Sequence, residues 1–340
     1  MKIAMISNNS IPVPPSEYGG TQREIYYLTE ELVRSGHEVI LFAKKGSIAK
    51  ATATYVYPYD DKRKQLEFIM RHIPKDVDII HDHCGLVAKS NPPIPTIRSY
   101  HGARKAIHVQ IPVYVSKTIL QKYGENEGYY LHNGIRLTDY RFRQKKKNYL
   151  LYIGRIEPMK GVHLAIEVAK KTGLKLLIAG PYDHNKVQKK YFNEVISPQL
   201  NKQIRYIGSV GGEEKQVLLS KARCVLFPSV WDEPFGIVMI EALACGTPVL
   251  GFQDGGAVPE VLHGLPQLIC RNTKDMVTKV LNPSAFPSAH QCRQYVEYHY
   301  SERVMVDKAL SLYRKILKGN HYKIYPDSEW NNLAAKRGWL

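Results

Sequence analysis

The chain has 340 residues, of which 44% are hydrophobic and 23% charged, so it can bury a sizeable core and is long enough for two domains. Its net charge of +17 leaves nucleic acid, an anionic membrane surface and a phosphorylated small molecule open as partners. Five cysteines without paired spacing argue against a zinc knuckle or a disulfide framework, and no uncharged apolar stretch reaches the ~18 residues of a membrane span. We therefore expect a reduced, cytoplasmic, globular protein.

Short apolar runs alternate with longer segments of helical period along the whole chain. The apolar runs predict strands buried on both faces: KIAMIS, EVILFA, VDIIH, PTIRSYH, IPVYVS and GYYLHN, then NYLLYIG, LKLLIAG, IRYIG, ARCVLFP and GTPVLG. Between them we expect helices that include residues 21–35, 161–172, 235–245 and 301–318. This succession of βα units predicts a doubly wound α/β fold with parallel sheets.

The strand and helix pattern restarts once, after a polar and basic segment at residues 136–148. We predict a first domain at residues 1–145, completed by a C-terminal helix at about 320–340, and a second domain at residues 146–319. Two such domains in tandem would face each other across a cleft at the carboxyl ends of their strands, where open α/β sheets bind ligands.

A glycine pair, Gly19-Gly20, follows the first strand and precedes a helix. Glycines at this place let a phosphate approach the N–H groups at the positive end of the helix. The alternative is a simple turn, because the GxGxxG spacing of dinucleotide-binding loops is missing.

A second candidate anion site follows the strand that ends at Gly154. Arg155 stands at the carboxyl end of this strand, and Lys160 precedes the next helix. Two cations beside a helix start could neutralise a pyrophosphate. A solvated loop is the alternative, but a lysine at a helix start opposes the helix dipole, which favours a ligand.

Two glutamates, Glu233 and Glu241, lie at either end of the stretch EPFGIVMIE, which otherwise predicts a buried helix. They are too far apart for an intrahelical pair. Carboxylates accept hydrogen bonds from vicinal hydroxyls, so the two could hold a sugar and a ribose on either side of a pyrophosphate. Helix capping by Glu233 and an exposed Glu241 are the alternative, which the apolar neighbours of Glu241 make less favourable.

These residues resemble the motifs of glycosyltransferase family 4, whose members have the two-domain GT-B fold. The resemblance covers nearly the whole chain and rests on six elements in the family's order: Gly19-Gly20, Asn133-Gly134, Arg155 with Lys160-Gly161, the Glu233 and Glu241 pair, the GTPV strand at 246–249, and Gly255-Gly256 with Pro259-Glu260. It implies two Rossmann-like domains facing each other across a cleft. It also implies that a hexosyl group moves with retention from a nucleotide diphosphate sugar to a hydroxyl of a glycan, glycolipid or small molecule.

The resemblance further implies a role for each matching residue. The catalytic residues would be His101, in the stretch SYHG and near the transferred sugar, Arg155 and Lys160 on the departing diphosphate, and Glu233 on the sugar hydroxyls. Glu241 would hold the ribose. The donor-binding residues would be Gly19, Gly20, Gly154, Arg155, Lys160, Glu233, Phe235, Gly236, Ile237, Val238 and Glu241. We expect a UDP-sugar rather than a GDP-sugar as donor substrate, with no cofactor.

We expect no metal site. The residues His81, Asp82 and His83 carry ligand side chains, but successive strand residues project from alternate faces, and the family needs no divalent ion.

Three other functions remain open. A nucleotide-sugar epimerase would share the fold and the donor site, and a non-catalytic sugar-nucleotide binder would share the site residues. A nucleic-acid-binding protein is suggested only by the net charge, and no motif of interleaved basic and aromatic residues accompanies the run Lys145-Lys146-Lys147, so we expect no nucleic acid partner. The basic segment at 136–147 is either a contact for an anionic membrane or lipid-linked acceptor, or a solvated linker.

Overall fold

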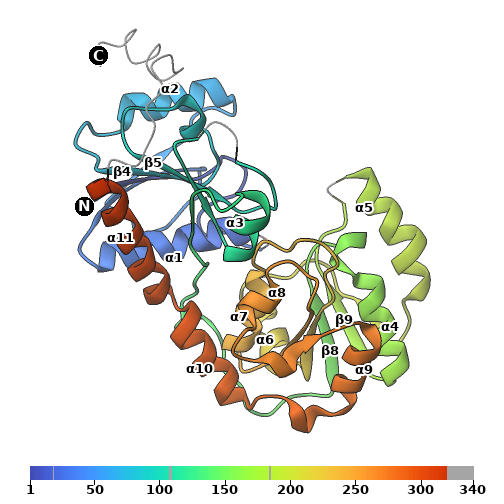
Figure 1. The fold of residues 1–340 in the computed structure, drawn as a ribbon. Coiled ribbons are helices and arrows are strands. Elements are labelled where there is room, and N and C mark those ends of the chain that lie inside the picture. The colour runs from blue at the N-terminus through green and yellow to red at the C-terminus, as the bar shows by residue number, and fades with distance from the viewer. Residues whose placement is uncertain (18, 107–108, 184, 320–340) are drawn as a thin grey trace. The chain divides into compact units, whose positions relative to one another are not determined.

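The structure, a computed structural model, describes residues 1–17, 19–106, 109–183 and 185–319. The chain divides into two compact units: one is formed by described residues of the ranges 1–134 and 302–319, the other by those of Ile135–Ser301. Each unit contains one parallel β-sheet covered by helices (Figure 1). The predicted fold class, two doubly wound parallel-sheet domains, is therefore confirmed.

The first unit is built on a seven-stranded sheet in the order β3-β2-β1-β4-β5-β6-β7. Its strands are β1 (Lys2–Ile6), β2 (Glu38–Ala43), β3 (Ala53–Val56), β4 (Ile79–Asp82), β5 (Thr96–Tyr100), β6 (Ile111–Tyr114) and β7 (Tyr129–Tyr130). Its helices are α1 (Gly20–Arg34), α2 (Lys62–His72), α3 (Lys117–Tyr123), α11 (Glu302–Gly319) and the short η1 (Ala88–Ser90).

Alternating residues of the central strands face opposite sides of this sheet. Ile6 and Ile80 pack with Leu66 of α2 in one core cluster. On the other side, His81 reaches Tyr313 of α11, which packs beside α1 (Figure 1). In β1 and β2 every residue after the first is buried, because both faces are covered, which is why these two sequences lack a polar face.

The second unit is built on a six-stranded sheet in the order β10-β9-β8-β11-β12-β13. Its strands are β8 (Tyr149–Ile153), β9 (Lys175–Ala179), β10 (Ile204–Tyr206), β11 (Cys224–Phe227), β12 (Val249–Phe252) and β13 (Ile269–Cys270). Its helices are α4 (Val162–Thr172), α5 (Lys186–Tyr191), α6 (Gly212–Lys221), α7 (Ile237–Ala244), α8 (Val258–Val261), α9 (Thr273–Leu281) and α10 (Ala289–Tyr300). Short helical turns are η2 (Leu137–Asp139), η3 (Pro158–Lys160), η4 (Phe192–Ile196), η5 (Ser197–Gln199), η6 (Pro266–Leu268) and η7 (Pro283–Ala285).

The strand order reverses direction once in each sheet, between β1 and β4 in the first unit and between β8 and β11 in the second. At such a switch point the neighbouring crossovers run to opposite faces, so the loops that follow the two strands separate and leave room for a ligand. The loops after β1, β4, β8 and β11 are therefore the first places to look for a site.

The predicted domain boundary at residues 145 and 146 differs from the division in the structure. Residues 135–145 belong to the second unit, where the N–H of Ile135 donates to Tyr300 and that of Arg143 to Cys245. Residues 302–319, predicted for the second domain, belong to the first unit because α11 packs on α1. The predicted helix at about 320–340 lies outside the described residues.

Two predicted helices begin later than expected. Gly161 and Gly236 have positive φ angles of 73° and 79°, which a right-handed helix does not contain, so α4 begins at Val162 and α7 at Ile237. No helix in the described ranges is long and apolar enough to cross a membrane.

Candidate functional site

Arg155 lies at the switch point of the second unit, two residues beyond the end of β8. Its Nη1 is 2.8 Å from Oε1 of Glu157, which also accepts a hydrogen bond from Gln188. Its Nε is buried and has no hydrogen-bond acceptor among the described residues. A buried donor without an acceptor is costly, so this guanidinium is suited to an anionic ligand.

Lys160 and Glu233, predicted separately from the sequence, form one ion pair. Lys160 Nζ lies 2.5 Å from Glu233 Oε2, and their side chains are only 13% and 9% exposed. The indole N–H of Trp231 donates to the same oxygen at 3.1 Å, and the ammonium lies 4.8 Å from the centroid of the Trp231 ring. Glu233 is therefore neither exposed nor a simple helix cap.

Glycines bring the loops of this pair together. A Cβ on Gly161 would overlap the carbonyl oxygen of Pro228, so only glycine lets the turn of Lys160 approach the loop that follows β11. Gly256 has a φ of 63° and lies against the backbone of Glu233, whose carbonyl accepts from Ala257 at 2.9 Å. The glycine-pair motif thus holds the backbone of Glu233 in place.

Glu241 lies on α7 and is 1% exposed. Its Oε1 accepts a hydrogen bond from Tyr140 at 3.0 Å, and its Oε2 lies 2.5 Å from Nζ of Lys215 on α6. The alternative of an exposed Glu241 is therefore wrong. Both glutamates of the motif are buried carboxylates, and each is paired with a lysine.

The start of α7 carries the remaining donor-side candidates. Phe235 is buried and packs edge-on against Tyr300, with ring centroids 5.6 Å apart. Gly236 caps the helix, and Ile237 and Val238 begin it, half-buried. The N–H of Met239 donates to the carbonyl oxygen of Gly236 at 2.9 Å, while those of Ile237 and Val238 have no acceptor within the helix and could face a ligand.

Gly154 lies at the carboxyl end of β8, where its N–H donates to Ala179 at 3.0 Å. A Cβ on Gly180, after β9, would overlap the carbonyl oxygen of Gly154. The loops that follow β8 and β9 are therefore in direct contact.

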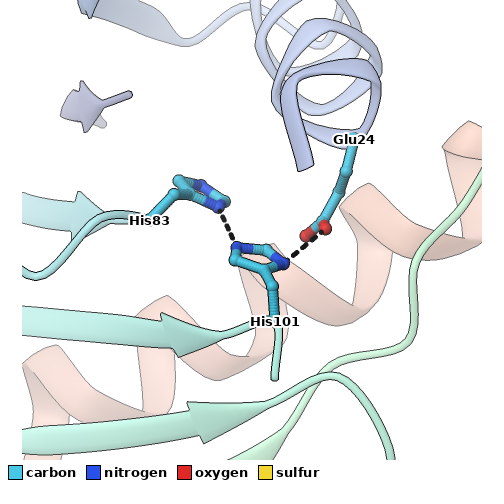
Figure 2. Close-up of side chains that lie close together, drawn as sticks. All are labelled: Glu24, His83 and His101. Carbon is cyan, nitrogen blue, oxygen red and sulfur yellow. Dashed lines mark hydrogen bonds and ion pairs between the residues drawn. The ribbon is translucent and has the colours of Figure 1, made fainter. Parts of the chain in front are cut away.

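The candidates of the first unit lie around its own switch point. Gly20 begins α1, and a Cβ on Gly19 would lie 2.7 Å from Cβ of Pro15, so the loop packs closely against the helix start. His101 directly follows β5, and Figure 2 shows its ring between Glu24 of α1 and His83, which follows β4. The ring of His81 stacks on that of His83, with centroids 4.0 Å apart, but its two nitrogens contact Ser99 and Tyr313 and not His101.

Sequence reasoning missed the partners of these residues. Trp231 lies two residues before Glu233, and its indole N–H could have identified it as a hydrogen-bond donor to that carboxylate. Glu157 is two residues from Arg155, but nothing in its spacing distinguishes it from a surface glutamate. Tyr140 and Lys215 are distant in sequence from Glu241 and carry no motif, so only the fold identifies them.

The basic segment at 136–147 is in part structural. Lys146 Nζ is half-buried and donates to the carbonyl oxygens of Ser220 and Cys245 and to Oγ1 of Thr247, at 3.0, 3.1 and 2.8 Å. Burial lowers the pKa of this lysine to about 8. Arg141 pairs with Glu213 at 2.6 Å. The segment therefore presents fewer free cations than its sequence suggests.

A cavity of about 600 Å³ opens in the first unit beside the ends of β1 and β4 and the start of α2. Its lining includes Leu66 and Leu86 as apolar residues and Asn8 and Asn9 as polar ones. The charged residues that line it are Asp60, Lys62, Arg63 and Lys89. Asp60 is held by a hydrogen bond from Asn9 at 2.8 Å.

Comparisons with known proteins agree with this arrangement. Residues 139–296, most of the second unit, match the family described as glycosyl transferases group 1. An uncharacterized glycosyltransferase of Methanocaldococcus jannaschii is 26% identical over 60% of this chain, and the match spans 65% of that relative, less than two thirds of its length.

Two solved structures are similar over nearly the whole chain. AviGT4, a glycosyltransferase involved in avilamycin A biosynthesis, is 26% identical with a TM-score of 0.78, covering 94% of this chain and 98% of its own. Anabaena HepE in complex with UDP-glucose is 14% identical with a TM-score of 0.70, covering 92% and 99%. The fold of this chain is therefore GT-B, and the comparisons support glycosyl transfer as its reaction.

Proposed function

We propose that this protein is a retaining glycosyltransferase of family 4 that moves a hexosyl group from a nucleotide diphosphate sugar to a hydroxyl acceptor. The observation that carries the proposal is the buried pair of Lys160 and Glu233, at the switch point of the second sheet, where Arg155 also follows β8. A cation, a carboxylate and an unsatisfied guanidinium N–H at one sheet edge match the needs of a sugar diphosphate.

Donor binding would exchange partners within this pair. A diphosphate that reaches Lys160 competes with Glu233 for the ammonium, and the carboxylate is then available to accept hydrogen bonds from hexose hydroxyls. Lys160 and Glu233 are thereby coupled, so that phosphate and sugar are recognised together. The HepE complex makes UDP-glucose the first donor to test, in line with the prediction of a UDP-sugar.

Glu241 would bind the ribose without losing its own partners. Its two oxygens offer about four lone-pair sites, and Tyr140 and Lys215 are among their partners. The ribose hydroxyls would donate to the same carboxylate, while Lys215 keeps its buried charge neutralised.

In the reaction, the bond between the anomeric carbon and the diphosphate oxygen breaks, and the acceptor oxygen bonds to the same face of that carbon. The acceptor's proton passes to an oxygen of the departing diphosphate. Arg155 and Lys160 would stabilise the charge that develops on this leaving group, commonly the largest contribution to catalysis. These two cations fill the role that a divalent ion has in other transferases, so we propose a metal-independent reaction.

The acceptor would use the cavity of the first unit. Three cations, Lys62, Arg63 and Lys89, line it against a single acid, Asp60, and its polar and apolar walls suit a sugar ring. We therefore favour an acceptor that carries a phosphate or a carboxylate over a neutral one.

The five cysteines are free thiols in this structure, and a cytoplasmic location stays a proposal. Peripheral contact with an anionic membrane stays a proposal, and it is weakened by the inward position of Lys146.

A panel of nucleotide sugars, with and without acceptors, tests the proposed function through release of the nucleoside diphosphate. Transfer should persist in excess EDTA and should be lost in Lys160→Ala. An isomerised sugar formed from donor alone would point to an epimerase, and binding without turnover of any donor would point to a non-catalytic binder. Retention is checked by NMR of the anomeric proton in the product.

A further inference from the structure

Three titratable side chains of the first unit, Glu24, His101 and His83, form one chain of polar contacts, an ion pair followed by a hydrogen bond (Figure 2). Oε2 of Glu24 lies 3.2 Å from Nδ1 of His101. The other ring nitrogen of His101, Nε2, lies 3.1 Å from Nδ1 of His83. The chain ends at Met5 on β1, whose sulfur lies 3.0 Å from Nε2 of His83. Both nitrogens of each ring therefore have a partner.

Two imidazoles and a carboxylate also form metal sites, and the polar atoms of this cluster lie within 4.8 Å of one another. The ring geometry of His83 and His101 favours a hydrogen bond instead. Their ring centroids are 5.2 Å apart and their facing nitrogens 3.1 Å apart. The centroid separation exceeds the nitrogen separation by nearly the distance from centroid to nitrogen in both rings together. The nitrogens therefore lie nearly on the line between the rings. An ion on that line, at ~2.0–2.1 Å from each nitrogen, would need a separation of about 4 Å.

The sulfur of Met5 decides which nitrogen of His83 carries the proton. Burial holds the pKa of His83 well below its usual value, so the ring is neutral and has one N–H group. A thioether sulfur accepts hydrogen bonds but cannot donate them, so the N–H is Nε2, facing Met5. Nδ1 of His83 is then an acceptor, and Nε2 of His101 must be the donor.

Glu24 requires a second proton on the same ring of His101. Its side chain is 1% exposed, and its Oε2 has no hydrogen-bond partner among the described residues, so the ion pair with Nδ1 of His101 is the contact that can balance its charge. A carboxylate oxygen and an unprotonated ring nitrogen repel each other, and a buried carboxylate without a cation is costly. A proton on Nδ1 of His101 would supply the positive charge that this ion pair needs.

We propose that Glu24 and His83 are positioning residues that hold His101 doubly protonated and in one orientation at the end of β5. The proposal rests on the proposed function and on the family resemblance, which implies that His101 lies near the transferred sugar. A ring held at both nitrogens cannot turn and cannot give up a proton without breaking the chain. His101 would therefore act as a fixed positive group toward the donor's oxygens, and not as a general acid or base.

Two further titratable groups pack against the chain. The ring of His81 stacks on that of His83 at 4.0 Å, and Nδ1 of His81 lies 2.7 Å from the hydroxyl of Tyr313 on α11. Burial lowers the pKa of His81 to about 3 and raises that of Tyr313, so both are neutral at physiological pH. The charge of the cluster is thus confined to Glu24 and His101.

NMR of the histidine ring nitrogens in the ¹⁵N-labelled protein tests the protonation directly, without any activity. At neutral pH we expect two protonated nitrogens on His101 and one, Nε2, on His83, with the His101 signals assigned by their loss in His101→Gln. A neutral His101 overturns the proposal. One equivalent of Zn²⁺ should leave both rings unchanged, and a joint shift of both would show a metal site and overturn it as well.

Kinetics test the positioning role. Glu24→Gln keeps the size and an acceptor oxygen but removes the charge, so kcat should fall roughly 10²-fold, with the loss growing as the pH rises, while KM for the donor changes little. Glu24→Asp should recover part of kcat. Glu30→Gln, on the same helix but bonded to the backbone of Lys50, is the matched control and should be unaffected.

Wild-type kcat and an unchanged pH profile in Glu24→Gln would overturn the proposal. Failure of the proposed function has a different signature, because the wild type would then transfer no sugar at all while the NMR spectrum still reported the protonation of His101.

Discussion

Lys160 Nζ and Glu233 Oε2 are 2.5 Å apart in side chains that are both almost fully buried. Removing one partner of such a pair leaves an uncompensated charge, which costs about 3 kcal/mol or more. Lys160→Met, which keeps the stem against Trp231, should therefore destabilise the protein and abolish turnover. Adding Glu233→Gln should restore most of the stability but no turnover.

Denaturant unfolding of the two single variants and the double variant measures this coupling. The exposed pair of Glu167 and Lys171 on α4, 2.6 Å apart, is the matched control, and its coupling should not exceed about 0.5 kcal/mol. Strictly additive effects of Lys160→Met and Glu233→Gln would contradict the buried pair.

Arg155→Lys keeps the charge but loses the planar fork that binds a diphosphate with two parallel hydrogen bonds. We expect kcat to fall roughly 10²–10³-fold, because this contact strengthens as the leaving group departs. Arg205→Lys, an exposed substitution on β10, should have no effect. Steady-state kinetics with the best donor of the panel decides the point, and similar kcat values in the two variants would remove Arg155 from the site.

The sequence predicted the residues around Lys160 and Glu233 because the backbone conformation there requires particular residue types, above all glycine. Gly161 and Gly256 are required where one loop touches another backbone, and such close approaches leave a glycine at a fixed offset in the sequence. The βα alternation likewise predicted both sheets, because strands buried on two faces must be apolar throughout. Lys215 and Tyr140 could not be predicted, since their contact with Glu241 depends on how α6 and the segment before β8 pack on α7.

The domain boundary was misplaced for a related reason. Residues 135–145 are polar and basic, as in a linker, but their backbone and side chains bond to the second unit. Composition shows how hydrophilic a segment is. It does not show which carbonyl oxygens accept hydrogen bonds from the lysines and N–H groups of the segment, and these bonds decide to which unit the segment belongs. The continuation of the chain from α10 to α11 gave no sign that α11 returns to the first unit.

His81 should make the protein sensitive to acid. Burial lowers its pKa from 6.5 to about 3, so the unfolded state binds a proton between these pH values and the folded state does not. This contribution to stability is complete above pH 6.5 and falls as the pH drops toward 3. At about pH 5 the loss is about 2 kcal/mol.

Unfolding free energies of the wild type and of His81→Gln, measured at neutral pH and at about pH 5, check this expectation. The variant is less stable at neutral pH because it loses the bonds to Ser99 and Tyr313, but its stability should fall less between the two pH values. His290→Gln, at an exposed position, is the control. Equal pH dependence in His81→Gln and the wild type would contradict the prediction.

The cavity of the first unit should select acceptors by charge. Exchanging Lys89 and Arg63 for alanine removes two of its three cations, so KM for a phosphorylated or carboxylated acceptor should rise roughly tenfold, with little change for a neutral acceptor or for the donor. Added salt should raise the wild-type KM in the same selective way. Equal effects on charged and neutral acceptors would place the acceptor elsewhere.

The two glutamates of the motif should differ in what they recognise. A free nucleoside diphosphate has a ribose but no hexose, so only a contact with Glu241 is common to it and to the donor. Glu241→Gln should weaken the binding of both ligands by the value of a charged hydrogen bond, about 1.5–3 kcal/mol, or roughly tenfold to a hundredfold in Kd.

Glu233→Gln should instead leave Lys160 without its carboxylate partner. The nucleoside diphosphate should then bind as well as to the wild type or better, while kcat falls and the protein discriminates less between donor sugars. Calorimetric titration of both variants with the nucleoside diphosphate gives the comparison. The titration is run below the unfolding temperature of Glu241→Gln, because that substitution also removes the carboxylate that pairs with Lys215 and so lowers the stability of the protein. Equal weakening in the two variants would mean that the glutamates do not divide sugar and ribose between them.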